Sequence, residues 1–177
     1  MNGDAMRGID FTVKGVVRTG RGSYVVLIDE SSTTYFPVQC QPFQASLVEN
    51  ILGEETEIVL ANYGLYFSLL SVFKAHGMFP TQLSLSVGKR GGAECLLELV
   101  EENELVTKVS RIPLLLPDAV AISALGKIPM VVYGPAGSDF AFPIGKGVPK
   151  QNVFSFVCEE IAKAERFASI GSEDGQE

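Results

Sequence analysis

Hydrophobic and polar residues alternate along the first forty positions in the manner of β-strands. Residues 9–18 and 23–29 alternate well enough to predict two strands, and residues 33–39 predict a third after the turn "ESS". The second and third strands form a predicted hairpin with the acidic tip "DESS". Pro37 indicates an edge position or the end of pairing, because proline has no N–H group to donate to a neighbouring strand.

Apolar residues then recur every three or four positions, as they do on one face of a helix. Residues 42–53 predict a helix that begins at Pro42 and ends at Gly53. Residues 66–77 predict a second helix, which ends at Gly77.

The rest of the chain continues this mixture of strands and helices. Strict alternation predicts a strand over residues 81–88, and the helix that follows the second hairpin is closed by Gly126. The other predicted elements are a short strand (56–64), a hairpin with the tip "EENE" (93–102 and 104–116), a helix (117–127), a strand (128–134) and an amphipathic helix (152–170).

Two stretches, residues 23–53 and 93–126, share one order of features: a hairpin with an acidic tip, an apolar strand, a proline, an alanine-containing helix and a glycine. A ββα unit used twice would explain this pattern. The sequence therefore predicts an α+β fold with helices packed on a largely antiparallel or mixed sheet. We divide it into a domain (9–134), a Gly- and Pro-rich loop with a C-terminal amphipathic helix packed on that domain (135–170), and a disordered tail (171–177).

Charge and composition narrow the class of protein. The 177 residues have a formal net charge of −7, and no dense Lys/Arg cluster appears, so high-affinity binding to duplex DNA is disfavoured. The cations in residues 15–23 and 88–92 stand beside glycines and indicate turns. No apolar run is long enough to cross a bilayer and no apolar signal core begins the sequence, so we expect a cytoplasmic protein with no membrane partner.

Cysteine and histidine chemistry is sparse. Cys40, Cys95 and Cys158 form no CxxC pair, which disfavours a zinc ribbon or a disulfide framework. His76 is the only histidine and precedes a predicted helix end, where a positive charge favours the helix dipole. The sequence shows no evident cofactor motif.

Asp118 is the one charge in "LLLPDAVAIS", residues 115–124, and it has two interpretations. With Pro117 at the first helical position, Asp118 falls in the first turn, where a carboxylate stabilises the positive end of a helix. Alternatively, Asp118 faces a groove at the helix start and acts as a catalytic acid.

Acidic residues also gather at the two hairpin tips. Asp29 and Glu30 occupy one tip, and Glu101, Glu102 and Glu104 occupy the other. If the hairpins are neighbours, these carboxylates could together hold a metal ion. More often such tips are simply solvated.

The segments "FPVQCQPFQASLVENILG" and "LLLPDAVAISALGKIPMVVYG", in this order, resemble the bifunctional nuclease domain family. The resemblance spans about residues 11–134 and includes Asp118 with Ala119, which match the family's Ser-Asp-Ala helix start, and Pro42 with Phe43. It implies a compact α+β domain, often a homodimer, and an activity on RNA and DNA.

The chain also departs from that family. The family usually has Arg-Pro-Ser-Asp where this chain has Leu115, Leu116, Pro117 and Asp118, and a polar Thr-His-Asp stretch where this chain has residues 65–67, "LYF". Arginine binds phosphate through paired hydrogen bonds, and His and Asp transfer protons or bind metals. Leucine and phenylalanine have no polar group for any of these roles.

Two functions follow from this comparison. In the first, the protein is a divergent nuclease that hydrolyses single-stranded RNA or DNA weakly, with Asp118 as the catalytic carboxylate, Glu98 as a helper, and Mg²⁺ or Mn²⁺ as cofactor. In the second, the protein is a non-catalytic homodimeric binding or assembly module, because apolar residues in place of a polar groove suit a protein interface.

Overall fold

A computed structural model describes residues 8–53, 64–87, 93–102, 107–133 and 141–170. The predicted strand 56–64 and tail 171–177 therefore lie almost wholly or wholly outside the described residues. The strands are β1 (Gly8–Arg18), β2 (Ser23–Asp29), β3 (Thr34–Cys40), β4 (Met78–Val87), β5 (Ala93–Glu102), β6 (Thr107–Leu114), β7 (Met130–Tyr133) and β8 (Phe142–Pro143). The helices are α1 (Pro42–Leu52), α3 (Gly64–Ala75), α4 (Leu116–Gly126), the 3₁₀ turn η1 (Lys150–Asn152) and α5 (Val153–Ile170).

The strands form one mixed sheet in the order β6-β5-β4-β7-β1-β2-β3-β8. Strand β7 pairs in parallel with β4, and every other pair of described strands is antiparallel. The predicted α+β fold with a mixed sheet is thus confirmed. Pro37 pairs opposite Val26, and β8 extends the sheet only beside Thr34 and Tyr35, so Pro37 lies on the largely free edge of β3.

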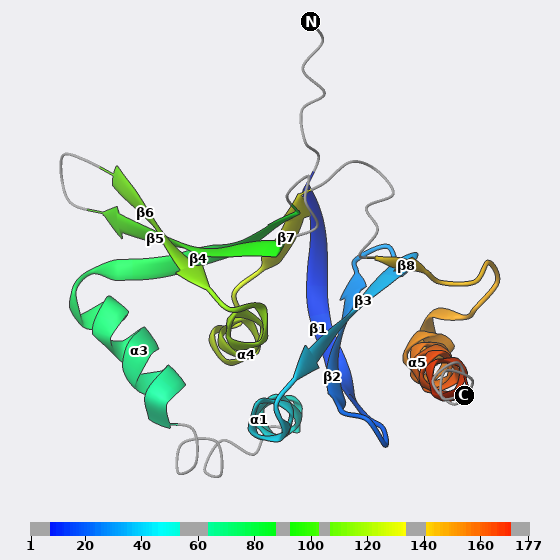
Figure 1. The fold of residues 1–177 in the computed structure, drawn as a ribbon. Helices are drawn as coiled ribbons and strands as arrows, with labels where there is room; N and C mark the ends of the chain where they lie inside the picture. The colour runs from blue at the N-terminus through cyan, green and yellow to red at the C-terminus, as the bar shows by residue number, and fades with distance from the viewer. Residues whose placement is uncertain (1–7, 54–63, 88–92, 103–106, 134–140, 171–177) are drawn as a thin grey trace, which may run out of the picture.

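Helices cover the two faces of the sheet unequally (Figure 1). One face packs against α1, α3 and α4, where residues of both halves of the sheet share one core with Val120 and Ile122. The opposite face is covered by α5 over β1, β2 and β3, where Val26 and Ile28 pack against Val157. Because side chains alternate along a strand, each sheet residue faces one of these two layers.

The outer face of β4, β5 and β6 has no such cover among the described helices, since α5 packs on the β1–β3 half (Figure 1). Leu83, Leu97 and Ile112 point to the helix side and join its core. Their neighbours Gln82, Glu98 and Arg111 therefore point to the outer face.

Helix α4 differs from its predicted form at both ends. It begins at Leu116, one residue earlier than expected, so Pro117 lies at the second helical position and Asp118 at the third. The left-handed residue that ends it is Lys127, with φ 52°, and not Gly126. Gly126 instead allows Ile128 to pack closely against the end of the helix, because a Cβ on residue 126 would lie only 2.8 Å from Ile128 Cδ1.

The two acidic tips are not neighbours, which contradicts the metal site that they could have formed together. The β2–β3 and β5–β6 hairpins lie on opposite sides of β4, β7 and β1. Asp29 is also buried and not solvated, since its carboxylate accepts hydrogen bonds from Ser31, Thr33 and Thr34. Burial alone would raise the pKa of Asp29, but these hydrogen bonds outweigh burial and lower it. Glu30 is exposed, and Glu104 lies outside the described residues.

The C-terminal helix α5 packs on the β1–β3 half of the sheet, and its buried stripe differs slightly from the one that the sequence pattern indicates. Val153, Val157 and Ile161 are buried, whereas Phe154 is half-buried and Ala164 is exposed. None of the described helices is both long enough and apolar enough to span a membrane.

Candidate functional site

Asp118 lies where three helices begin. Its Oδ1 atom accepts a hydrogen bond of 2.6 Å from Gln44 Nε2 in the first turn of α1. The same oxygen accepts a second hydrogen bond, of 2.7 Å, from the Tyr66 hydroxyl near the start of α3. The carboxylate of α4 thus joins the first turns of α1 and α3, in addition to its favourable place at the positive end of its own helix.

The two donors are themselves held in place. Gln44 is 5% exposed, and its Oε1 accepts a hydrogen bond of 3.0 Å from the Gln41 backbone N–H, which leaves its amide N–H₂ pointing toward Asp118. Tyr66 is 8% exposed. Burial and the hydrogen bond to Asp118 raise the pKa of Tyr66 to about 12, so its hydroxyl remains protonated and able to donate at neutral pH.

A divalent cation does not fit this arrangement. Mg²⁺ and Mn²⁺ need several oxygen ligands that present lone pairs to the ion. At Asp118 Oδ1 the neighbours present an N–H and an O–H group, and both protons point at the carboxylate. Across the described parts of the chain, no three His, Cys, Asp or Glu side chains gather where they could hold a metal ion.

Glu98, the proposed helper acid, lies on the other side of the sheet from Asp118. Its strand neighbours Leu97 and Leu99 belong to the core that α4 closes, so Glu98 points to the uncovered outer face. The structure therefore does not bring these two carboxylates together, and this part of the nuclease prediction is wrong.

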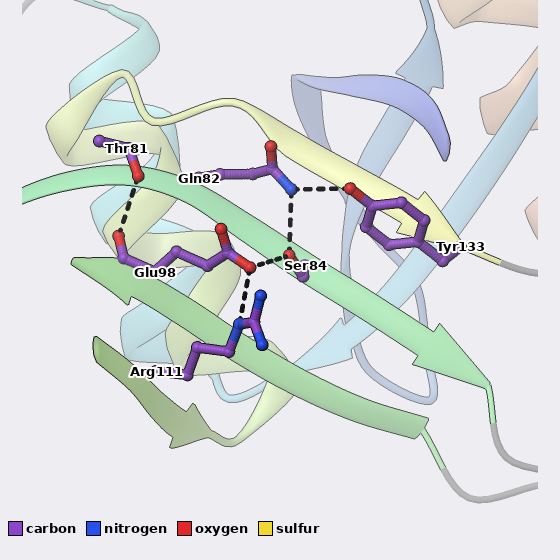
Figure 2. Close-up of polar contacts among 6 residues, drawn as sticks. All are labelled: Thr81, Gln82, Ser84, Glu98, Arg111 and Tyr133. Carbon is purple, nitrogen blue, oxygen red and sulfur yellow. Dashed lines mark hydrogen bonds and ion pairs between the residues drawn. The ribbon is translucent and has the colours of Figure 1, made fainter. Parts of the chain in front are cut away.

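Glu98 instead lies in the middle of a hydrogen-bonded polar network on the outer face of β4, β5 and β6 (Figure 2). Its Oε1 accepts hydrogen bonds from Arg111 Nε at 3.0 Å and from Ser84 Oγ at 3.3 Å. Gln82 Nε2 donates to Ser84 Oγ and to the Tyr133 hydroxyl, each at 3.0 Å. Five side chains from four neighbouring strands are therefore linked across this surface (Figure 2).

Apolar rows flank this network along the strands. Cross-strand pairing places Phe79, Val100 and Val109 in one row, and both Phe79 and Val109 are exposed large hydrophobic residues. On the other side, Ser84 pairs with Leu96 and Leu96 with Pro113. We call the two rows and the network between them the outer sheet face. It combines apolar area with one half-buried acid, Glu98, and one exposed base, Arg111.

His76 and the cysteines take no part in either arrangement. His76 is exposed after α3, where its Nδ1 lies 2.9 Å from the Val72 carbonyl oxygen, in keeping with a residue at a helix end. Cys95 is buried in the core, and burial raises the pKa of its thiol to about 11. Cys40 and Cys158 are half-buried, and all three are free thiols.

Comparison with known proteins leaves the family open. No protein-family model matches this chain, and no curated protein matches it significantly.

Sequence patterns did not reveal the partners of Asp118. Gln44 is a polar residue within an otherwise apolar helical stripe, and its position three residues after Gln41 is that of a capping box. A polar residue at a position of the apolar stripe indicates a buried hydrogen bond, and this was the one feature of the sequence that pointed to Gln44. Tyr66, between the exposed Leu65 and the half-buried Phe67, carried no such signal because its neighbours are apolar.

Proposed function

We propose that this protein is a divergent bifunctional-nuclease-like module that acts in the cytoplasm by forming a homodimer, and that it does not hydrolyse nucleic acid at Asp118. The observation that carries this proposal is the double hydrogen bond to Asp118 Oδ1. A carboxylate that joins three helices is engaged in holding the fold, and the hypothesis of a catalytic acid loses its one named residue.

The outer sheet face supports a second copy of the chain as the partner. Each copy has a net charge of −7, so two copies repel each other in most orientations. At the centre of the outer sheet face, however, the charges of Glu98 and Arg111 offset each other. A twofold axis beside this pair would set Arg111 of each copy near Glu98 of the other, as an isologous interface requires.

The apolar rows supply the rest of the expected interface. The exposed Phe79 and Val109, with the half-buried Val100 between them, form an apolar row on an uncovered β-surface, and the half-buried Leu96 with the exposed Pro113 forms another. Interfaces combine apolar area with polar groups that fix orientation, and this face contains both, with the charged pair between two apolar rows.

The decisive experiment measures mass in solution with a matched pair of variants. Val109 on the outer sheet face is 53% exposed, and Val72 on α3 is 51% exposed, so Val109→Glu and Val72→Glu add the same charge at equally tolerant positions. We expect light scattering to give twice the 19.0 kDa of one chain for the wild type and for Val72→Glu. Val109→Glu should be monomeric, because two buried glutamates would face each other across the twofold axis.

Two results would contradict the proposal. If the wild type is monomeric at protein concentrations of tens of micromolar, or if Val109→Glu stays dimeric, the outer sheet face is not a dimer interface. Cleavage of single-stranded RNA or DNA by the wild type with Mg²⁺ or Mn²⁺, abolished in Asp118→Asn, would restore the nuclease hypothesis. If cleavage is equal in both proteins, contamination explains it.

A further inference from the structure

Strand β6 is one edge of the sheet, and its outer side has no partner among the described strands. The strand order begins with β6, which pairs only with β5, whereas the other edge is the two-residue β8. None of the described helices lies along the outer side of β6 (Figure 1). An edge strand of eight residues presents a row of main-chain donors and acceptors to which another extended chain can pair.

One hydrogen bond shows which residues of β6 direct their main-chain groups outward. The Glu98 carbonyl oxygen accepts a hydrogen bond of 3.3 Å from Thr81 Oγ1 on β4, so the main-chain groups of Glu98 point toward β4 and away from β6 (Figure 2). In an antiparallel ladder such a residue lies opposite one whose own N–H and C=O point away from it, which here is Arg111. By alternation, Val109 and Pro113 also point outward. This direction suits Pro113, because its missing N–H then breaks no bond to β5.

The charges along β6 determine which kind of strand can pair there. Residues 107–114, TKVSRIPL, include Lys108 and Arg111 and no acid, in a chain of net charge −7. Lys108 is exposed and forms no ion pair with the side chains that the structure describes. Arg111 donates to Glu98 through Nε, and its two terminal nitrogens make no hydrogen bond with any described residue. Both cations are therefore available to carboxylates on an added strand.

A second copy of β6 does not provide such carboxylates. Two β6 strands side by side would bring four cations together with no acid on either strand, and like charges on neighbouring strands are destabilising. The edge differs in this respect from the outer sheet face, where the charges of Glu98 and Arg111 offset each other. The charges of β6 thus favour a different chain, with acidic residues, as the partner at this edge.

Strand β5 shows the side-chain pattern that fits β6. Each cation of β6 lies opposite an acid of β5, and two apolar residues of β6 lie opposite apolar ones. These pairs are Leu97–Ile112, Glu98–Arg111, Val100–Val109 and Glu101–Lys108. Along β5 the order is an apolar residue, an acid, any residue, an apolar residue and an acid. Because directly opposite side chains lie on the same face, a strand on the free side of β6 would meet the same four side chains.

We propose that the free edge of β6 binds an extended acidic peptide segment of another protein, which has this pattern and pairs antiparallel to β6. Main-chain hydrogen bonds supply affinity, and Lys108 and Arg111 select the acids. This inference does not rest on the proposed dimer, which uses the outer sheet face. Lys108 lies on the other face, because it alternates in step with Ile112, whose side chain packs on the helix-side core.

Fluorescence anisotropy of labelled peptides titrated with the full-length protein tests this proposal. The probe is the six-residue peptide LLELVE, the sequence of residues 96–101, with both ends blocked and fluorescein attached through a flexible linker. We expect saturable binding with a Kd of about 10–200 μM at low salt. The peptide LLKLVK, in which lysines replace both glutamates, should bind at least about tenfold more weakly, because it brings like charges to β6.

Methylation of main-chain nitrogens in the peptide tests the direction of pairing. In the register of β5, the third and fifth peptide residues lie opposite Arg111 and Val109, so their N–H groups face β6. N-methylation of these two residues should weaken binding at least about tenfold, because it removes the main-chain donors. N-methylation of the second and fourth residues, whose N–H groups face away, should weaken it less than about threefold. Equal loss with the two methylated peptides would overturn the proposed strand addition.

A matched pair of protein variants tests the role of charge. Lys108→Glu should weaken binding of LLELVE by about five- to tenfold, whereas Lys146→Glu, at an exposed position after β8, should weaken it less than about twofold. Circular dichroism should show that both variants remain folded, because both side chains are exposed. Equal loss in the two variants would mean that net charge alone governs binding, and would overturn the site.

Light scattering separates this proposal from the proposed dimer. Lys108→Glu should keep the mass of the wild type, because Lys108 is not on the outer sheet face. If Lys108→Glu changes that mass, a second copy occupies the edge and the acidic peptide does not. If LLELVE does not bind at up to about 1 mM, the inference fails whatever the mass, and Lys108, Arg111 and Pro113 only prevent pairing at the edge. A monomeric wild type that binds LLELVE would contradict the dimer alone.

Discussion

At the scale of single residues, the chain uses its few polar groups in the interior to fix the relative positions of elements. Asp118 connects three helix starts, and Asp29 closes the β2–β3 turn through hydrogen bonds to residues that follow it. Both were identified in the sequence as acidic residues of interest, but their partners make structural roles the simpler explanation.

Removal of the Asp118 carboxylate should destabilise the protein strongly. In Asp118→Ala, the buried Gln44 and Tyr66 donors lose their acceptor, which should lower the free energy of unfolding by about 2–4 kcal/mol. Asp118→Asn keeps an oxygen at that position and should cost less than half as much. Urea unfolding at pH 7 measures both, with Glu159→Ala on the exposed side of α5 as a control for loss of a carboxylate. Equal effects of Asp118→Ala and Glu159→Ala would contradict this role.

Tyr66 should make stability depend on pH in the alkaline range. Its pKa is raised from 10.0 in a free tyrosine to about 12 in the fold, so the folded state favours the protonated hydroxyl. The resulting contribution, of up to about 2–3 kcal/mol, is complete below pH 10 and is lost as the pH rises from 10 to 12. Tyr66→Phe should therefore be less stable than the wild type at pH 8, and the difference should shrink by pH 11.5. A difference that stays constant in urea unfolding over this range would refute the raised pKa.

At the scale of elements, local patterns predicted most helices and strands because hydrophobic periodicity and turn residues are local properties. The β2–β3 and β5–β6 hairpins, and the helices that follow them, form as expected. The order of strands in the sheet was not predictable, because it depends on contacts between distant segments such as β1 with β7. For the same reason the sequence did not separate Asp118 from Glu98, which lie on opposite sides of the sheet.

The attachment of α5 offers a test at this scale. The register of β1 against β2 shifts between Val13 and Gly15. A Cβ on Gly15 would lie 2.4 Å from Phe154 Cζ on α5. Gly15→Ala should therefore displace the Phe154 ring and cost about 1–3 kcal/mol. In a Phe154→Ala background the same change should be neutral or slightly stabilising, because alanine suits a strand better than glycine. A double-mutant cycle from thermal unfolding measures the coupling, and additive effects would show that the two residues do not compete for space.

At the scale of the whole molecule, the distribution of charge decides how copies of the chain meet. A net charge of −7 opposes association over a long range, while the centre of the outer sheet face is locally balanced by Glu98 and Arg111. The Arg111 side chain of that ion pair is 63% exposed, so the pair contributes little by itself. The apolar rows must then supply most of the affinity of the proposed dimer.

Salt should therefore strengthen dimerisation. Raising sodium chloride from about 20 mM to about 300 mM shortens the screening length and weakens the repulsion between two acidic copies, whereas the apolar contacts remain. Sedimentation equilibrium should show a lower dissociation constant at high salt. If the dissociation constant rises with salt instead, attraction between charges dominates the interface and the assignment of the apolar rows is wrong.

The position of β7 has a consequence for biosynthesis. Met130–Tyr133 lies between β1 and β4, so the strand that joins the two halves of the sheet comes late in the chain. While the ribosome is still translating the preceding codons, the facing edges of β1 and β4 have no neighbour and remain open to other nascent polypeptides. Productive folding in the cell therefore depends on the release of residue 133 before these edges meet another chain.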